Sequence, residues 1–223
     1  MAVTTDITKN YTLQRILVNE YRTHQMVWKF FANDAVKDRD FLYRVELYNG
    51  LPTVYTVSRR EPANVNDVWS GMTKAYEPTV ARGQRLGFVL RANPTKKVYD
   101  DEGNHFRRDV VLGAKIEMER NGIPRERWPS NYEIVHDAGV AWLESKGDMH
   151  GFSIEPNEIS IDSYLQRSFR AKKGKPNIVI NTVDYSGTLV VDEPERFVDA
   201  LYSGIGPAKG FGCGLLMVRP ARG

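Results

Sequence analysis

The sequence predicts an α+β fold made of two ferredoxin-like modules in tandem, each with RRM-like topology. Three observations lead to this prediction. The 223 residues suit one large domain or two small ones. Strand-like and helix-like stretches follow the order strand, helix, strand, strand, helix, strand, and the order starts again after the polar segment ARGQ at residues 81–84. We therefore expect an N-terminal module over residues 1–83 and a C-terminal module over residues 84–223.

The N-terminal module follows this order most clearly in its first half. Residues 2–8 are expected to form a weakly apolar first strand. Residues 19–33, NEYRTHQMVWKFFAN, predict a helix because apolar and aromatic side chains recur at three- and four-residue spacing. Residues 41–47 and 53–59 alternate as strands, and Asn49-Gly50 between them is a hairpin signal. A second helix is then expected around residues 62–72, followed by a strand in KAYEPTV (74–80).

The C-terminal module opens with a predicted strand in RLGFVLRA (85–92), which Asn93-Pro94 ends. A charged loop is expected over residues 98–110. Residues 131–147 have helical periodicity, with Gly147 as the C-terminal stop.

Two long strands are expected next, at 159–169 and 177–191. The segment DEPE (192–195) offers an N-cap with a carboxylate three residues further on, which predicts a helix over 195–204. LLMV (215–218) predicts the closing strand.

Composition narrows the class of protein. No apolar run is long enough to span a membrane, and the first residues, MAVTTDITKN, lack the apolar core of a secretory signal. The lone cysteine, Cys213, excludes an internal disulfide framework and fits a reducing cytosol. We therefore expect a cytoplasmic protein that does not contact a membrane.

Basic residues gather in one segment although the net charge is only +3. RSFRAKKGK, residues 167–175, contains five basic residues and no acid. A solvated turn is the simpler interpretation of such a segment, and a loop that binds a polyanion is the sharper one.

A glycine-rich stretch, GIGPAKGFGCGLLMV (204–218), has five glycines within eleven positions. It matches neither the Walker loop nor the dinucleotide fingerprint, and it leads from a helix into a strand, the reverse of both. ATP and NAD are therefore poor candidate ligands. A helix C-cap explains only the first glycine; the others allow the close approach of another backbone, including a nucleic-acid chain. Cys213 is most simply a small residue in a tight place.

Four segments together resemble one protein family. GIGPAKGFGCGLL, LRANPTKK (90–97), RDFLYRVE (39–46) and the EYRTH helix are similar to the CasE family, the CRISPR repeat-RNA endoribonucleases of type I-E Cascade complexes. The resemblance runs from about residue 19 to residue 217 and implies the same tandem ferredoxin-like fold. It also implies that the protein binds the hairpin of precursor CRISPR RNA and cuts it once at its 3′ base. The cut needs no metal or other cofactor and leaves a 2′,3′-cyclic phosphate, and the protein stays on the product as a subunit of Cascade.

The resemblance also implies functional residues. Catalysis falls to Tyr21 and His24 on the first helix, with Lys29 further along it. RNA binding falls to the LRANP segment, the basic loop and the glycine loop. The residues expected to bind RNA are Arg91, Arg167, Arg170, Lys172, Lys173, Lys175, Gly206, Lys209, Gly210 and Gly212.

The chemistry of metal-free RNA cleavage agrees with these residue types. The substrate's 2′-OH attacks the adjacent phosphorus, so the protein must move protons and offset negative charge. Histidine suits proton transfer because its reference pKa is near 6.5, while tyrosine can orient or donate a hydrogen bond and lysine supplies charge. On a helix, Tyr21 and His24 are neighbours three residues apart. The sequence leaves open which of the two is the base and which the acid.

Two rival functions stay open at the sequence level. Metal-dependent hydrolysis would need carboxylates around an ion, and Asp38 and Asp40 are the best available. A non-catalytic subunit that binds CRISPR RNA and supports assembly is the second rival. Of the other histidines, His105 and His136 are expected to face solvent or bond locally, and His150, in an expected loop, is a reserve acid–base candidate.

Overall fold

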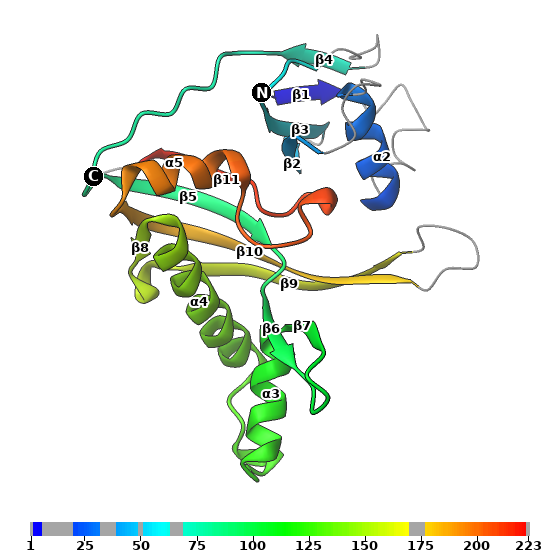
Figure 1. Ribbon diagram of the computed structural model, residues 1–223, viewed down its shortest axis with the longest axis vertical. Coiled ribbons are helices and arrows are strands. Elements are labelled where there is room, and N and C mark those ends of the chain that lie inside the picture. The colour runs from blue at the N-terminus through cyan, green and yellow to red at the C-terminus, as the bar shows by residue number, and fades with distance from the viewer. Residues whose placement is uncertain are drawn as a thin grey trace.

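Two antiparallel sheets organise the residues that this computed structural model describes, which are 2–5, 20–31, 39–48, 51–62, 69–169 and 177–221 (Figure 1). Each sheet has the strand order of a ferredoxin-like module, so the predicted tandem α+β fold is confirmed. Among the described residues, no helix is both long and apolar enough to cross a membrane.

The first sheet pairs its strands in the order β2-β3-β1-β4, with antiparallel neighbours throughout. Its strands are β1 (Ala2–Thr5), β2 (Phe41–Tyr48), β3 (Leu51–Ser58) and β4 (Trp69–Met72). Helix α2 (Glu20–Phe30) connects β1 to β2 in sequence. Tyr48 lies opposite Leu51, as a two-residue hairpin requires, although Asn49-Gly50 itself lies outside the described residues.

The end of the first module differs from the prediction. Residues 69–72 form strand β4 instead of the end of a helix, because they pair with β1; the rest of the expected helix, residues 63–68, lies outside the described residues. KAYEPTV is not a strand. Its Tyr76 and Val80 instead pack on the core of the second module, and the hydroxyl of Tyr202 donates a hydrogen bond to the Tyr76 carbonyl.

The first module has a compact aromatic core between α2 and its sheet. Val27, Phe30 and Phe31 lie buried on the helix side, and the rings of Phe31 and Phe41 stack at 4.5 Å between centroids. Because these apolar residues recur at helical spacing, the sequence could predict which face of α2 turns inward.

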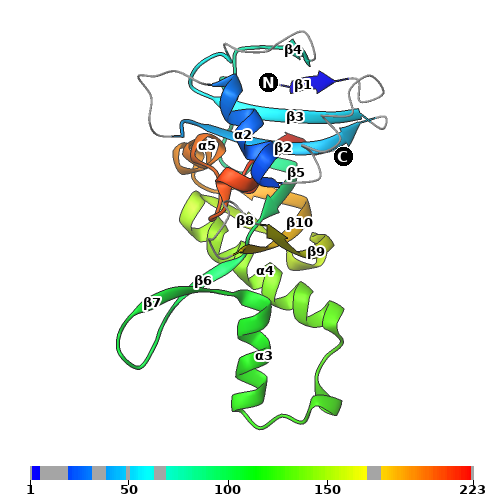
Figure 2. The same ribbon diagram turned by 90° about the vertical axis from the view of Figure 1, so that its right-hand side faces the viewer.

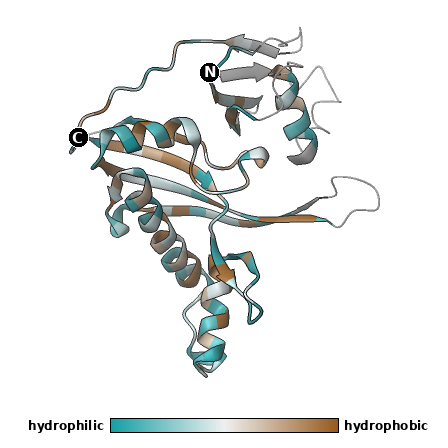
Figure 3. Cartoon of the chain, in the orientation of Figure 1, coloured by the Kyte–Doolittle hydropathy of each residue, from teal (hydrophilic) through white to brown (hydrophobic). Residues whose placement is uncertain are grey.

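The second sheet has the order β11-β5-β10-β8, with β9 also paired to β10. Its strands are β5 (Arg85–Ala92), β8 (Phe152–Ile154), β9 (Ser160–Phe169), β10 (Ile178–Val191) and β11 (Leu216–Pro220). Helices α4 (Asn131–His150) and α5 (Pro194–Ser203) pack on this sheet. Apolar and hydrophilic residues intersperse along these strands and helices (Figure 3), since one side of each faces the core.

An insertion between β5 and α4 protrudes from the second module (Figures 1 and 2). The expected charged loop is mostly a hairpin of β6 (Thr95–Tyr99) and β7 (His105–Asp109), paired with Lys97 opposite Arg107. Helix α3 (Val110–Arg120) and the 3₁₀ turn η2 (Arg125–Arg127) follow. The sequence pattern did not predict this hairpin, because its strands are charged and largely exposed on both faces and so lack an alternating apolar pattern.

Both helix-end predictions in the second module need correction. Gly147 does not end α4; it lies buried inside the helix, where a Cβ would clash with the Phe152 carbonyl oxygen. The helix continues to His150, and Gly151 caps it in the left-handed region at φ 74°. Helix α5 begins at Pro194 rather than Glu195, and its N-cap, Glu193, makes no side-chain capping hydrogen bond.

The two modules contact each other through β2. The Arg91 guanidinium on β5 binds Asp184 on β10 through two hydrogen bonds of 2.8 and 2.9 Å, and its Nη1 donates to the Val45 carbonyl on β2 at 3.4 Å. Arg44 of β2 also lies 3.5 Å from Asp184. Strand β5 starts directly after ARGQ, and the division of the chain at residues 83 and 84 stays a prediction.

Candidate active site

Helix α2 holds His24 half-buried beside its apolar stripe. Val27 and Phe30 are buried against the sheet, whereas the imidazole is half-buried, with its Nδ1 shielded from solvent. The ring of Trp28, one turn further on, lies 5.8 Å from the His24 ring. The helix therefore fixes the imidazole without burying it completely.

The glycine loop of the second module, residues 204–215, reaches across to this imidazole. It connects α5 to β11 and contains the 3₁₀ turn η4 (Lys209–Phe211). The Phe211 ring lies 5.9 Å from the His24 ring, and a Cβ at Gly210 would lie 3.6 Å from His24 Nδ1. The absence of a side chain at Gly210 thus leaves space directly beside the imidazole.

Contacts with the protein itself hold the glycine loop in place. The hydroxyl of Tyr43, on β2, donates a 2.8 Å hydrogen bond to the Gly210 carbonyl. Gly206 adopts φ 75°, and a Cβ there would come within 3.0 Å of the Trp142 ring. The sequence predicts that the glycines let a nucleic-acid backbone come close to the loop. In the structure, the side chains that come close to these glycines belong to the protein itself. RNA binding by Gly206, Gly210 and Gly212 stays a prediction.

Arg39 joins the site, and sequence reasoning missed it. It directly precedes β2 and is half-buried, and its Nη1 would lie 3.5 Å from a Cβ at Gly210. Its Nε is buried and makes no hydrogen bond within the described part of the chain. Burial, in the first place, lowers the pKa of the guanidinium, which still leaves it a cation at neutral pH. The signal was present in RDFLYRVE, where an arginine immediately precedes a largely apolar strand.

The environment of His24 lowers its pKa below the ordinary 6.5. Burial has the largest effect because it disfavours the charged imidazolium, and the positive charge of Arg39 acts in the same direction. A hydrogen bond with the Gly210 backbone opposes both. The imidazole is therefore mainly neutral at pH 7 and able to accept a proton.

The other two predicted catalytic residues share α2 with His24. Tyr21 lies one turn before His24, but its side chain is outside the described residues. Lys29 is exposed in the last turn of the helix. Five residues turn a helix by about 140° beyond one full turn, so the backbone does not align Lys29 with His24.

The structure describes only some of the predicted RNA-binding residues. Lys209 is half-buried in the glycine loop, and Arg167 is half-buried on β9, opposite Ile180. Arg91 bonds to Asp184, and this ion pair competes with any contact to a phosphate. The rest of the basic loop, namely Arg170, Lys172, Lys173 and Lys175, lies outside the described residues.

Cys213 is the small core residue that the sequence suggested. Its side chain is fully buried, and burial raises the pKa of its thiol to about 12. A thiol with this pKa stays protonated at pH 7 and is a poor nucleophile.

The carboxylates proposed for a metal rival are not clustered in the described structure. Both oxygens of Asp40 accept hydrogen bonds from Arg60, at 2.6 and 3.1 Å, and Asp38 lies outside the described residues. Within the described ranges, no three His, Cys, Asp or Glu side chains are grouped so that they could hold a metal ion.

The remaining histidines lie apart from this site. His105 is exposed on β7, and His136 lies 3.3 Å from Asp137, as expected. His150 was predicted to lie in a loop, but it is the last residue of α4. It is half-buried there, so its role as a reserve acid–base group loses its basis.

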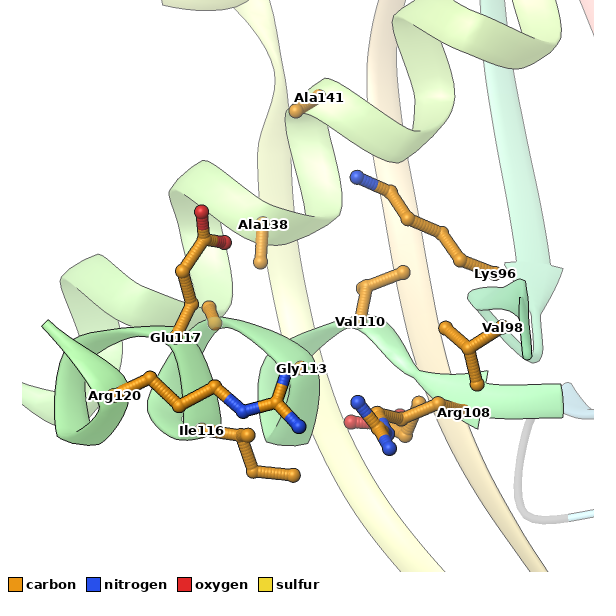
Figure 4. A pocket seen from close by; sticks show the side chains of 12 residues that line it. Lys96, Val98, Arg108, Val110, Gly113, Ile116, Glu117, Arg120, Ala138 and Ala141 are labelled. Carbon is orange, nitrogen blue, oxygen red and sulfur yellow. The ribbon is translucent and has the colours of Figure 1, made fainter. Parts of the chain in front are cut away.

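His24 is not among the residues that line two pockets of the described structure. One, of about 300 Å³, is lined by Arg39, Leu42 and Tyr202, between β2, β3 and α5. The other, of about 380 Å³, lies between the protruding insertion and α4, where Lys96, Arg108 and Arg120 surround an apolar floor (Figure 4).

Comparisons with known proteins agree over nearly the whole chain. A family model described as CRISPR associated protein matches residues 3–220. The chain is 30% identical over 210 residues to the CRISPR system Cascade subunit CasE of Escherichia coli (strain K12), which covers 90% of this chain and 92% of that protein. It is 28% identical over 227 residues to the CRISPR-associated endoribonuclease Cse3 of Thermus thermophilus, with 93% of each covered.

A solved structure of such a protein is also similar to this chain over nearly its whole length. The CRISPR endoribonuclease Cse3 bound to a 19-nucleotide RNA superposes with a TM-score of 0.70. The match has 25% sequence identity and covers 98% of this chain and 97% of that one.

Proposed function

This chain belongs to the family of CRISPR-associated proteins, and we propose that it cuts the repeat hairpin of precursor CRISPR RNA. The product is a mature guide RNA that the protein retains as a subunit of a Cascade complex in the cytoplasm. Similarity to a Cascade subunit and to a CRISPR-associated endoribonuclease, each over about nine tenths of the chain, supports this proposal.

One observation carries the catalytic part of the proposal. A neutral imidazole on the first module, His24, lies beside a backbone loop and a half-buried cation, Arg39, which has a buried and unbonded Nε. A scissile phosphodiester beside Gly210 would meet a proton acceptor and a positive charge together. These are two of the groups that RNA transesterification uses.

The reaction follows from these groups. The ribose 2′-oxygen forms a bond to the adjacent phosphorus while its proton passes to His24. The bond from phosphorus to the 5′-oxygen breaks, and that oxygen receives a proton, for which Tyr21 is the candidate donor. The products are a 2′,3′-cyclic phosphate and a 5′-hydroxyl. Arg39 offsets the negative charge that develops on the phosphoryl oxygens, and Lys29 is a further candidate for this role.

The basic loop and the glycine loop supply the binding surface. Their cations neutralise phosphates and position the hairpin, whereas base contacts would have to specify its sequence. Most of the basic loop lies outside the described residues. Lys209 and Arg167 are the predicted RNA-binding cations of these two loops that the structure does describe.

The experiment is cleavage of the CRISPR repeat RNA from the protein's own genome, in EDTA, with analysis of the product ends. A single cut that leaves a 2′,3′-cyclic phosphate supports the proposal, and a substrate with a 2′-deoxy residue at the cut site should bind without being cut. Cleavage that EDTA abolishes would favour the metal-dependent rival. Tight binding without any cleavage would favour a non-catalytic subunit.

A further inference from the structure

Outside the active site, a lysine and a histidine lie on the inner face of α4. Lys146 and His150 follow Trp142 at intervals of four residues, so the three share one side of the helix. Trp142 is buried, and Lys146 and His150 are half-buried. The acidic residues of this segment, Glu144 and Asp148, are exposed on the other side. This arrangement reverses the usual one, in which charged residues occupy the solvent face.

Trp142 shows what this face of α4 contacts. Its Nε1 donates a 3.2 Å hydrogen bond to the Thr95 carbonyl at the base of the β6–β7 hairpin. Its ring also packs against Gly206 of the glycine loop. Lys146 Nζ lies 5.7 Å from the centre of the same ring, and Arg107 Nη1 donates to Thr95 Oγ1 at 3.5 Å. The inner face of α4 therefore runs from the hairpin to the loop that contacts His24.

The cations along this line act on one another. Burial lowers the pKa of Lys146, and the charge of Arg107 adds to the effect. Burial also lowers the pKa of His150, with further contributions from the charges of Lys146, Lys209 and Arg196. The pKa of Lys209 is lowered by burial and then by Arg39, the cation of the active site. Lys146, His150 and Lys209 thus each lie in the positive field of at least one neighbouring cation, and His150 is mainly neutral at pH 7.

The row is not neutralised from within the protein. In the described part of the chain, no carboxylate forms an ion pair with Lys146, His150 or Lys209, whereas neighbouring Arg196 pairs with Glu193 at 2.7 Å. A partly buried cation without a carboxylate partner disfavours the folded state. Such a row is stabilised when a polyanion binds along it.

We propose that Arg107, Lys146 and Lys209 form a phosphate track, along which α4 guides the RNA backbone from the β6–β7 hairpin to the glycine loop. The inference rests on the proposed function, because it assumes that RNA is the polyanion that reaches His24. The track carries no sequence information of its own, since phosphates are the same at every nucleotide. It adds affinity and fixes the direction in which the strand enters the active site.

The test uses Lys146, which lies outside the catalytic site. Lys146→Gln should weaken binding of the full repeat RNA about tenfold. It should also reduce the slope of log Kd against log salt by about 0.7 to 0.9, the value for one phosphate contact. Lys146→Arg should restore both, and Lys74→Gln, with the same charge change at an exposed position between β4 and β5, should alter neither. The single-turnover rate at saturating protein should stay at the wild-type value.

Thermal unfolding separates a binding role from a structural one. Because Lys146→Gln removes a repelling charge, the melting temperature of the RNA-free protein should stay the same or rise. A normal Kd and an unchanged salt slope for Lys146→Gln would overturn the track, while cleavage by the wild type would leave the proposed function intact. If the wild type neither binds nor cuts the repeat, the proposed function fails first, and the track fails with it.

Discussion

Helices α2 and α4 occupy equivalent places in the two modules, each after the first strand of its sheet, and the glycine loop contacts both. At Gly210 the loop lies beside the imidazole of α2, and at Gly206 it lies against Trp142 of α4, next to Lys146. The first contact offers a proton acceptor and the second a row of positive charges. The two proposals together predict that one topology used twice supplies two separate functions, chemistry on one side of the loop and phosphate binding on the other.

The largest expected effect comes from removing the imidazole. His24→Ala should lower the single-turnover cleavage rate by about 10² to 10⁴ because general acid–base catalysis is lost. Its Kd for the repeat RNA should stay within about twofold of the wild-type value. His136→Ala, at a half-buried histidine on α4, is the matched control and should cut normally. If His24→Ala lowered the affinity for RNA but not the cleavage rate, the proposal that α2 supplies chemistry and α4 supplies binding would be contradicted.

Arg39 is expected to have the next largest effect. Arg39→Gln should reduce the cleavage rate about 10²-fold, because a preorganised cation at the developing charge is lost. Arg39→Lys should recover part of this rate, and the control Arg82→Gln, at an exposed arginine, should cut at the wild-type rate. If Arg39→Gln changed only the salt dependence of binding, Arg39 would belong to the phosphate track and not to the chemistry.

Asp184 pairs with Arg91 and Arg44 where the two modules meet, and this ion pair is expected to affect stability rather than catalysis. Burial would raise the pKa of Asp184, but hydrogen bonds and charge from Arg91, with Arg44, outweigh it and lower the pKa. Asp184→Asn should therefore destabilise the fold by about 2 to 3 kcal/mol in urea titrations at pH 7, since a partly buried guanidinium loses its partner. Asp137→Asn, at an exposed carboxylate, should have little effect.

The sign of the pH dependence follows from that lowered pKa. The stabilisation by Asp184 is present above the carboxyl's unfolded-state pKa and is lost as the pH falls through its lower folded-state value. The wild type and Asp184→Asn should thus converge in stability at low pH. A constant difference down to about pH 2 would show that the ion pair is not its source.

The smallest expected effect concerns the anchor of the loop. Tyr43→Phe removes the hydroxyl that donates to the Gly210 carbonyl, and it should cost about 1 kcal/mol of stability. The cleavage rate should fall only a few-fold, because Gly206 and Trp142 still hold the other end of the loop. A loss as large as that of His24→Ala would mean that Tyr43 acts in the chemistry itself.

Much of the fold could be predicted from the sequence because the strands of both modules carry periodic signals. The pattern of β5 and β10 and the apolar stripe of α2 placed the two sheets and the helix correctly. Strand β4 could not be found this way, since its four residues are defined by pairing with β1 rather than by their own pattern. The β6–β7 hairpin was hidden for a similar reason, because its strands are charged and mostly exposed.

The site was less predictable, because its parts come from both modules. Resemblance gave His24 and the glycine loop, but no spacing in the sequence relates Arg39 to Gly210, which lie 171 residues apart in the chain. Arg91 showed the opposite problem: it was predicted as an RNA contact, and its partner Asp184 only becomes apparent when β5 pairs with β10. Ion pairs that form only in the folded protein decide which basic residues are left to bind a phosphate.

The pH dependence of kcat/KM tests the central claim most directly, because it reports the protonation of groups in the free enzyme. The pKa of His24 lies below 6.5, chiefly through burial, so the imidazole is mainly neutral at pH 7, as the proposed proton acceptor must be. We predict that log kcat/KM rises with a slope of about 1 up to this pKa and then levels off, and that the residual activity of His24→Ala lacks this rise. The same rise in His24→Ala, or a fall in the wild type as the pH increases through this range, would contradict the account.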